Sequence, residues 1–347
     1  MAREATPIEA VSPLRISFVG GGTDFPHWFT EHGGAVLSAT IDHVVRVRLV
    51  PREDRLVEVR SLDLDQLVAY HLDEGPVYDG ALDLVKAAIA DAGLDVGVSV
   101  EIHSEAPPGS GLGGSSALVS ALVAGLAMLG HRTMSADELA RTAYRIERTD
   151  LGITGGWQDQ YAAAFGGCNL LEFSRSGVRV QRVADPERME RLAAGLLLCY
   201  TGHVRHNVGL IDRQIALHRE GREETLLGMK RLQEMAYAMR EAVERADLAV
   251  LGTLLRDAFV AKKQMNPYIA EHTPIEAMLD AARGAGAYGG KVCGAGGGGY
   301  VLVAAPPEAH PAIRAELQGL AGQFARFSFT PRGVRATRGA DTWAPTR

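Results

Sequence analysis

The sequence has few of the features that mark secreted, membrane or metal-binding proteins. Only three cysteines, Cys168, Cys199 and Cys293, occur in 347 residues, and no two of them form a C-x-x-C pair. This argues against a disulfide framework or a zinc site. No apolar run is long enough to span a bilayer, and the N-terminus lacks the apolar core of a signal peptide. We therefore expect a reduced, cytoplasmic location and no membrane partner.

The chain has a modest excess of negative charge and few aromatic residues. The formal net charge is −6, which argues against a nucleic-acid partner. Aromatic residues make up 6% of the chain, whereas 46% of the residues are hydrophobic. This composition and length favour an α/β enzyme with two domains, each large enough to bury a core.

Glycine, in contrast, is abundant and concentrated in a few places. The most informative stretch is Pro-Pro-Gly-Ser-Gly-Leu-Gly-Gly-Ser-Ser-Ala at 107–117. The alternating pattern at 96–103 predicts a strand before it, and the apolar run 117–129 predicts a buried helix after it. Glycines let a backbone approach a ligand closely, and the free N–H groups of a helix's first turn attract anions. The stretch therefore predicts a phosphate-binding loop.

Two common phosphate-binding loops fit this stretch poorly. No lysine follows the glycines, so the stretch is not a Walker A loop. Gly109, Gly111 and Gly114 form a G-x-G-x-x-G pattern, as in an NAD-binding Rossmann domain. A Rossmann unit needs a second parallel strand, but Ser135 and Glu138 form a capping box that opens another helix. An NAD-dependent dehydrogenase therefore remains only as an alternative.

The remaining pattern predicts two units, 1–185 and 186–347. In the first we expect strands at 14–19, 35–38, 43–50 and 96–103 and helices at 83–92, 117–129 and 135–148. The charged stretch 174–191 is interpreted as the crossing between units. The second unit is expected to be α+β, with strands at 196–200, 300–304 and 324–330, a mostly helical stretch at 208–263 and a helix at 309–320.

Two further glycine motifs accompany the central loop. The first is Pro-Leu-Arg-Ile-Ser-Phe-Val-Gly-Gly-Gly-Thr-Asp at 13–24, and the last is Lys-Val-Cys-Gly-Ala-Gly-Gly-Gly-Gly at 291–299. In this order the three motifs resemble those of the GHMP kinases, which include galactokinase and mevalonate kinase. Within that family the chain is most similar to bacterial D-glycero-D-manno-heptose 7-phosphate kinases, through Ser-Phe-Val-Gly-Gly-Gly-Thr-Asp, Pro-Pro-Gly-Ser-Gly-Leu-Gly, Ile-Glu-Arg and Gln-Asp-Gln-Tyr-Ala-Ala-Ala-Phe-Gly-Gly.

The resemblance implies a fold, a reaction and a set of ligands. It implies an N-terminal domain similar to domain 2 of ribosomal protein S5 and a ferredoxin-like C-terminal domain, with ATP and a sugar between them. The expected reaction phosphorylates the anomeric hydroxyl of D-glycero-D-manno-heptose 7-phosphate, using ATP and Mg²⁺. The expected partner is this small sugar or sugar phosphate, and a homodimer is the assembly to test.

The resemblance also assigns roles to individual residues. Asp159 takes the position of the catalytic base, and Arg15 would keep its carboxylate ionised and stabilise charge on the transferred phosphoryl group. Ser116, with Ser115 beside it, and Glu147 would hold Mg²⁺. The residues assigned to ATP are Pro108, Gly109, Ser110, Gly111, Leu112, Gly113, Gly114, Ser115 and Ser116. Those assigned to the sugar are Gly21, Gly22, Thr23, Asp24, Gly155, Gly156, Trp157, Arg205, Gly296 and Gly297.

Two departures from the family pattern bear on the substrate. Galactokinases have Glu-His where this chain has Gly21 and Gly22, which argues against galactose. Heptose kinases usually have a lysine at the position of Trp157, so the 7-phosphate would need another cation, such as Arg205, His203 or His206. The alternatives are a kinase of an unphosphorylated or fucose-like sugar and a nucleotide-binding homologue without catalysis.

Overall fold

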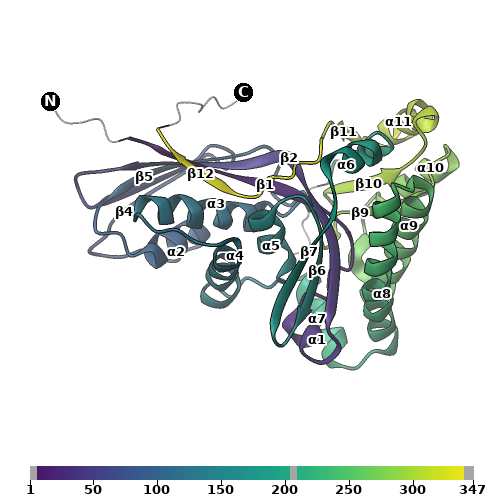
Figure 1. Ribbon diagram of the computed structural model, residues 1–347, viewed down its shortest axis with the longest axis horizontal. Coiled ribbons are helices and arrows are strands. Elements are labelled where there is room, and N and C mark those ends of the chain that lie inside the picture. The colour runs from purple at the N-terminus through teal and green to yellow at the C-terminus, as the bar shows by residue number, and fades with distance from the viewer. Residues whose placement is uncertain (1–5, 204–208, 340–347) are drawn as a thin grey trace.

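A long, fully buried strand organises the first sheet of the protein. The computed structural model describes residues 6–203 and 209–339. β1 lies between β2 and β12 in a sheet with the order β12-β1-β2-β5-β3-β4, and β6 and β7 branch from β2 (Figure 1). The strands of this sheet are β1 (Ile8–Val19), β2 (Gly34–Pro51), β3 (Leu56–Ser61), β4 (Gln66–His71), β5 (Val98–Ser104), β6 (Cys168–Ser174), β7 (Gly177–Ala184) and β12 (Arg335–Arg338).

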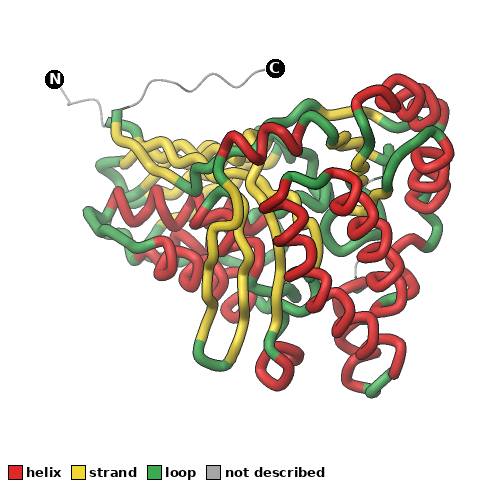
Figure 2. The backbone as a smooth tube through the Cα atoms, turned by 45° about the vertical axis from the view of Figure 1, so that its right-hand side comes forward, coloured by secondary structure: helices red, strands yellow, loops and turns green. Residues whose placement is uncertain are grey.

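The strands predicted at 35–38 and 43–50 form one strand, β2. Its first half pairs with β6 and its second half with β5. The hairpin of β6 and β7 and the adjoining half of β2 project from the rest of the sheet in both views (Figures 1 and 2). β2 thus links two branches of one sheet, which a pattern of alternating residues cannot reveal.

Helices cover one face of this sheet (Figure 1). They are α2 (Asp83–Ala92), α3 (Gly114–Leu129), α4 (Ala136–Tyr144), the π-helix η1 (Arg145–Asp150) and α5 (Gln158–Phe165), while α1 (Pro26–His32) follows β1. The capping box of Ser135 and Glu138 is confirmed. β5 leads through α3 into α4, and its sheet neighbours are β2 and β3, so the Rossmann alternative is wrong.

The second sheet has four antiparallel strands in the order β11-β8-β10-β9. Its strands are β8 (Leu196–Tyr200), β9 (Gly289–Val292), β10 (Tyr300–Ala304) and β11 (Gln323–Ala325). The helices around it are α6 (Pro186–Ala193), α7 (Leu210–Arg219), α8 (Glu223–Arg245), α9 (Leu248–Met265), η2 (Pro267–Ala270), α10 (Ile275–Gly284), η3 (Pro307–Ala309) and α11 (His310–Gly319). This arrangement is the expected α+β fold.

One hydrophobic core joins the two sheets. Residues of β1 and β2, such as Leu14, Ile16 and Leu37, belong to the same buried cluster as Leu232 of α8 and Leu255 of α9. No helix among residues 6–203 and 209–339 is both long and apolar enough to cross a membrane. The shared core fixes the position of α8 and α9 against the first sheet.

The structure corrects two parts of the predicted organisation. The stretch 174–191, expected only as the crossing between units, holds β7 and most of α6, and Asp185 caps α6 by accepting a hydrogen bond from the Arg188 N–H at 2.8 Å. The strand predicted at 324–330 ends at Ala325, beyond which Phe329 makes an isolated bridge to Ile41. The predicted boundary at 185/186 falls between β7 and α6, although β12 returns to the first sheet.

Candidate active site

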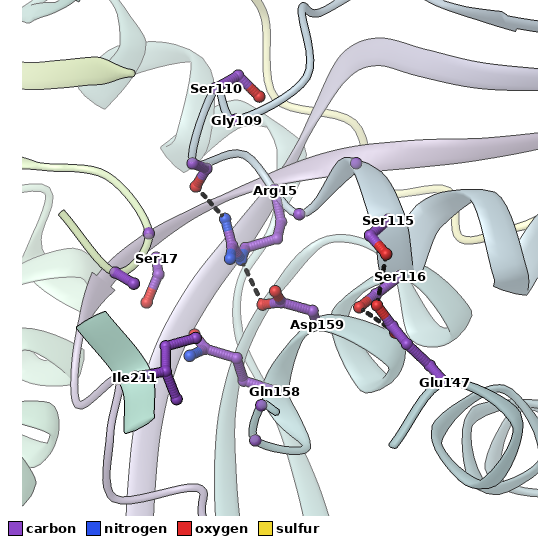
Figure 3. A pocket seen from close by; sticks show the side chains of 18 of the residues that line it. Arg15, Ser17, Gly109, Ser110, Ser115, Ser116, Glu147, Gln158, Asp159 and Ile211 are labelled. Carbon is purple, nitrogen blue, oxygen red and sulfur yellow. Dashed lines mark hydrogen bonds and ion pairs between the residues drawn. The ribbon is translucent and has the colours of Figure 1, made fainter. Parts of the chain in front are cut away.

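A cavity of about 540 Å³ lies where loops from the first sheet meet α7 and α9. Its wall includes both ends of the first motif, the central glycine loop, η1, the loop before α5 and the start of the third motif. Figure 3 shows how side chains from these distant segments converge on it. The predicted site residues that line it are Arg15, Gly21, Gly22, Asp24, Pro108, Gly109, Ser110, Gly111, Gly113, Gly114, Ser115, Ser116, Glu147, Gly155, Gly156 and Asp159.

The central glycine loop brings the N-terminus of α3 to the cavity. Gly111 and Gly113 have φ angles of 79° and 81°, which disfavour other residues, and a Cβ on Gly111 would lie 2.6 Å from the Cys293 carbonyl oxygen. Because α3 begins after Gly113 without a side-chain cap, its first N–H groups remain available to a ligand. The positive end of the helix dipole favours an anion there. Leu112 is different, because its side chain is buried in the core rather than in the cavity wall.

Arg15 connects two parts of the site. Its Nε donates a hydrogen bond to Asp159 Oδ1 at 2.7 Å, and a second guanidinium nitrogen donates to the Gly111 carbonyl oxygen at 2.6 Å (Figure 3). The Arg15 side chain is 6% exposed and that of Asp159 is 18% exposed. One cation therefore fixes both the carboxylate in the first turn of α5 and the backbone of the glycine loop.

Glu147 lies at the opposite side of the site, against the first turn of α3 (Figure 3). It is fully buried and accepts hydrogen bonds from the Ser115 hydroxyl at 2.5 Å, the Ser116 hydroxyl at 2.7 Å and the Gln160 amide at 2.7 Å. The sequence pattern predicts that Glu147 lies at the end of an α-helix, but in the structure it belongs to the π-helix η1. π-helical turns are frequent at functional sites, because the additional residue redirects side chains.

Three cations that the sequence analysis left without a role also line the cavity: Arg148, Lys262 and Lys291. An Arg148 nitrogen lies 3.4 Å from Glu147 Oε1. Lys262 donates to the Gly294 carbonyl oxygen at 2.8 Å, and Lys291 donates to the Ser17 carbonyl oxygen at 2.7 Å. Burial lowers the pKa of Lys291 to about 8. With Arg15, these residues give the cavity a positive wall that suits phosphate groups.

Two neighbouring polar residues of the first motif differ in their position. Asp24 is buried and accepts hydrogen bonds from the Gly22 N–H at 2.9 Å and the Gln158 N–H at 3.1 Å, and burial raises its pKa. Thr23 is absent from the cavity wall, and its hydroxyl donates to the Gly20 carbonyl oxygen at 2.8 Å. Thr23 therefore holds the turn together, while Asp24 connects that turn to the start of α5.

Other residues assigned to the sugar lie outside the wall. The Trp157 ring stacks on Tyr144 with centroids 3.9 Å apart. It therefore packs against a neighbouring helix and is not part of the cavity wall. In the third motif, Gly294 and Ala295 line the cavity instead of Gly296 and Gly297, and the Gly297 N–H is taken up by the Ile269 carbonyl oxygen at 2.7 Å. The assignments of Arg205 and His206 lie outside the described residues.

The sequence analysis also missed an apolar part of the wall. It is formed by Val45 of β2, Ile102 of β5, Leu84 of α2 and Ala106, with Asp63 at its edge. The Asp63 carboxylate accepts a hydrogen bond from the Ser104 N–H at 2.6 Å. These residues belong to different strands and helices, so only the fold reveals that they share one surface. An apolar surface beside a phosphate-binding loop suits a planar base.

Comparisons with known proteins all point to one family, the GHMP kinases. Residues 78–167 match the GHMP kinases N terminal domain and residues 239–320 match the GHMP kinases C terminal domain. The chain is 34% identical over 339 residues to a D-glycero-alpha-D-manno-heptose 7-phosphate kinase of Campylobacter jejuni, covering 95% of this chain and 99% of that protein.

Solved structures give the same picture. A D-glycero-D-manno-heptose 1-phosphate kinase from Bacteroides thetaiotaomicron has a TM-score of 0.78 and 26% identity, covering 98% of this chain and 100% of its own. Lactococcus lactis galactokinase complexed with galactose has a TM-score of 0.79 at 20% identity, covering 95% of each chain, which shows a shared fold.

Proposed function

Because this chain belongs to the GHMP kinase family and is therefore a phosphotransferase with a hydroxyl group as acceptor, we propose that it phosphorylates the anomeric hydroxyl of D-glycero-D-manno-heptose 7-phosphate. ATP is the phosphoryl donor, and the products are the sugar 1,7-bisphosphate and ADP. The single observation that carries the proposed phosphoryl transfer is the hydrogen-bonded pair of Arg15 and Asp159 in a cavity that also contains the N-terminus of α3.

Asp159 is the proposed base. Its carboxylate accepts the proton of the sugar's C1 hydroxyl as the oxygen attacks the γ-phosphorus of ATP, and the bond to the bridging oxygen of ADP breaks. Arg15 holds the carboxylate in place through its hydrogen bond and puts positive charge near the transferred group. The Arg15–Gly111 bond then ties this base to the loop that would carry the triphosphate.

The residues of this chain fit a magnesium ion bound mainly by phosphate and water. Among the residues described, no group of three or more His, Cys, Asp or Glu side chains could hold a metal. Mg²⁺ usually keeps several waters and needs only one or two protein oxygens when phosphates complete its shell. Glu147 and Ser116 offer a carboxylate and a hydroxyl 2.7 Å apart at the N-terminus of α3. Bound there, the ion would neutralise charge on the β- and γ-phosphates.

Replacing Glu147 with glutamine tests this assignment. The variant keeps the shape of the side chain but removes its charge, so we expect the Mg²⁺ concentration for half-maximal activity to rise by about tenfold or more. Isothermal titration with MgADP measures the same loss without turnover. Exposed Glu316 of α11 supplies a matched control, Glu316→Gln. An unchanged Mg²⁺ requirement in a folded Glu147→Gln variant would show that Glu147 is not a ligand.

Lys291 predicts a pH dependence. Its pKa of about 8 means that the ammonium group is charged below this pH and neutral above it. We therefore expect kcat/KM for ATP to fall by about tenfold as the pH rises through 8, because one positive donor at the phosphate site is lost. The decrease should be absent from Lys291→Met. If that variant titrates like the parent protein, another group is responsible.

The substrate assignment depends on the similarity across nearly the whole chain to the Campylobacter heptose 7-phosphate kinase. Loss of the family's lysine at Trp157 is compatible with a sugar phosphate, because Trp157 lies outside the cavity and Arg148, Lys262 and Lys291 line it.

An unphosphorylated sugar is the second candidate. A bifunctional fucokinase/GDP-fucose pyrophosphorylase of Arabidopsis thaliana is 27% identical over 84% of this chain and 29% of that protein, and this similarity supports the second candidate. The cytoplasmic location and the homodimer stay predictions.

A panel of acceptors tests the proposed function. ADP release is measured with ATP and each of D-glycero-D-manno-heptose 7-phosphate, the unphosphorylated heptose, L-fucose, galactose and mevalonate. We expect the heptose 7-phosphate to give the highest kcat/KM. A higher value for an unphosphorylated sugar would replace the proposed substrate, and ATP binding without turnover of any acceptor would favour the non-catalytic alternative.

A further inference from the structure

We propose that Gln158 and Gln214 form an amide pair that recognises hydroxyl groups of the acceptor and sets the enzyme's choice of sugar. The two side chains come from different parts of the fold, Gln158 from the start of α5 and Gln214 from α7, and both line the cavity. The inference depends on one part of the proposed function, namely that the acceptor is a sugar with several hydroxyl groups.

Each amide has a buried polar atom without a hydrogen-bond partner among the described residues. For Gln214 this atom is Nε2, a donor, and the residue is only 6% exposed. For Gln158 it is Oε1, an acceptor. Buried polar groups are nearly always paired in folded proteins, so an unpaired donor and an unpaired acceptor on two residues that line one cavity point to a ligand that supplies both partners.

The two amides lie against adjacent glycines of the first motif. A Cβ on Gly21 would lie 3.1 Å from Gln158 Nε2, and one on Gly22 would lie 2.9 Å from Gln214 Nε2. The two amides therefore lie against the backbone of Gly21 and Gly22, and the Met265 sulfur, 2.7 Å from the same Cβ on Gly22, lies there as well. Ile211, which also lines the cavity, precedes Gln214 by one turn of α7.

Asp24 fixes Gln158 in this position. Its carboxylate accepts the Gln158 backbone N–H at 3.1 Å and the Gln158 Nε2 group at 3.4 Å, which leaves Oε1 for a ligand. Gln158 and Asp159 both line the cavity (Figure 3), so a hydroxyl bound at Oε1 lies in the same cavity as the proposed base. A sugar held here can thus present another of its hydroxyls to Asp159.

The chemistry of the pair favours hydroxyl groups over phosphate. A hydroxyl both donates and accepts, so neighbouring hydroxyls of a sugar can satisfy an amide N–H and an amide carbonyl together. Phosphate oxygens at neutral pH only accept and would leave Gln158 Oε1 unpaired. The cations Arg148, Lys262 and Lys291 offer the better site for a phosphate elsewhere on the same wall.

Methionine substitutions test the pair, because methionine has a similar length and cannot form these bonds. For Gln214→Met and Gln158→Met we expect kcat/KM for heptose 7-phosphate to fall about tenfold each, with an unchanged KM for ATP. Gln318→Met, at an exposed position of α11, serves as the control. Gln214→Glu, which keeps the shape and replaces the donor, should give the same loss if the methionine variant does not fold. An unchanged sugar KM and kcat in folded variants would overturn the proposal.

Monodeoxy analogues of the sugar separate recognition from a structural effect. We expect the parent enzyme to lose about tenfold in kcat/KM on the analogue that lacks the hydroxyl bound by Gln214, and Gln214→Met to lose little more on that analogue. Equal losses in both enzymes on every analogue would contradict recognition by Gln214. If the parent enzyme does not use heptose 7-phosphate, the proposed function fails, and the same comparison with the best acceptor of the panel still tests the amide pair.

Discussion

Asp159→Asn is expected to lower kcat by about 10³-fold, the largest effect of any single substitution considered for this enzyme. Asparagine keeps the size of the side chain but cannot take the proton of the sugar hydroxyl. Asp159 Oδ1 accepts a hydrogen bond from Arg15 Nε at 2.7 Å, and the carbonyl oxygen of asparagine can accept the same bond. The affinity for MgATP should therefore change little.

Two measurements distinguish loss of the base from loss of structure. Single-turnover kinetics should show a slower chemical step, and titration with MgADP should give an unchanged dissociation constant. Asp257→Asn, at a surface position of α9, provides a matched control with unchanged kcat. Full turnover by a folded Asp159→Asn variant would mean that Asp159 is not the base.

Arg15→Met is expected to lower kcat by about 10²–10³-fold and to raise the KM for ATP. The substitution removes the cation that bonds Asp159 at 2.7 Å and the Gly111 carbonyl at 2.6 Å. It therefore weakens charge stabilisation at the transferred phosphoryl group and loosens the glycine loop. Steady-state kinetics with ATP and heptose 7-phosphate measure both effects.

A double-mutant cycle shows whether Arg15 acts together with Asp159. If the two form one unit, Arg15→Met should cost much less in the Asp159→Asn background than in the parent enzyme. Arg15→Lys should recover only part of the activity, because lysine keeps the charge but lacks the planar fork that bonds two groups at once. If the loss of kcat in the double variant equals the product of the two single losses, Arg15 and Asp159 act independently and the proposed coupling is wrong.

Much of the fold follows from local patterns in the sequence. The buried helix α3 and the capped helix α4 were predicted from an apolar run and from Ser135 and Glu138. β4 was missed because much of its surface is exposed. β7 does alternate, with Val178 and Val180 on either side of Arg179, but its charged stretch was interpreted as the crossing between units. β12 was missed because its short segment, Arg335–Arg338, is polar and depends on its partner β1 for pairing.

Local sequence patterns predict fewer of the site residues. Glu147 and Asp159 are not distinctive in their own surroundings, and their assignment came from the position of motifs in a resembling family. Gln214 and Lys262 lie on amphipathic helices, where nothing in the sequence separates them from surface residues. Trp157, in contrast, was assigned to the sugar and does not line the cavity. It departs from the family pattern close to Asp159 in sequence, but its ring packs on Tyr144 outside the cavity.

The most direct test of the proposed reaction is phosphorus NMR of the product formed from heptose 7-phosphate and MgATP. The proposal predicts one ADP for each new phosphate resonance, coupling of that resonance to the anomeric proton, and retention of the 7-phosphate signal. A phosphate on any other carbon, or ADP accompanied only by inorganic phosphate, would contradict it.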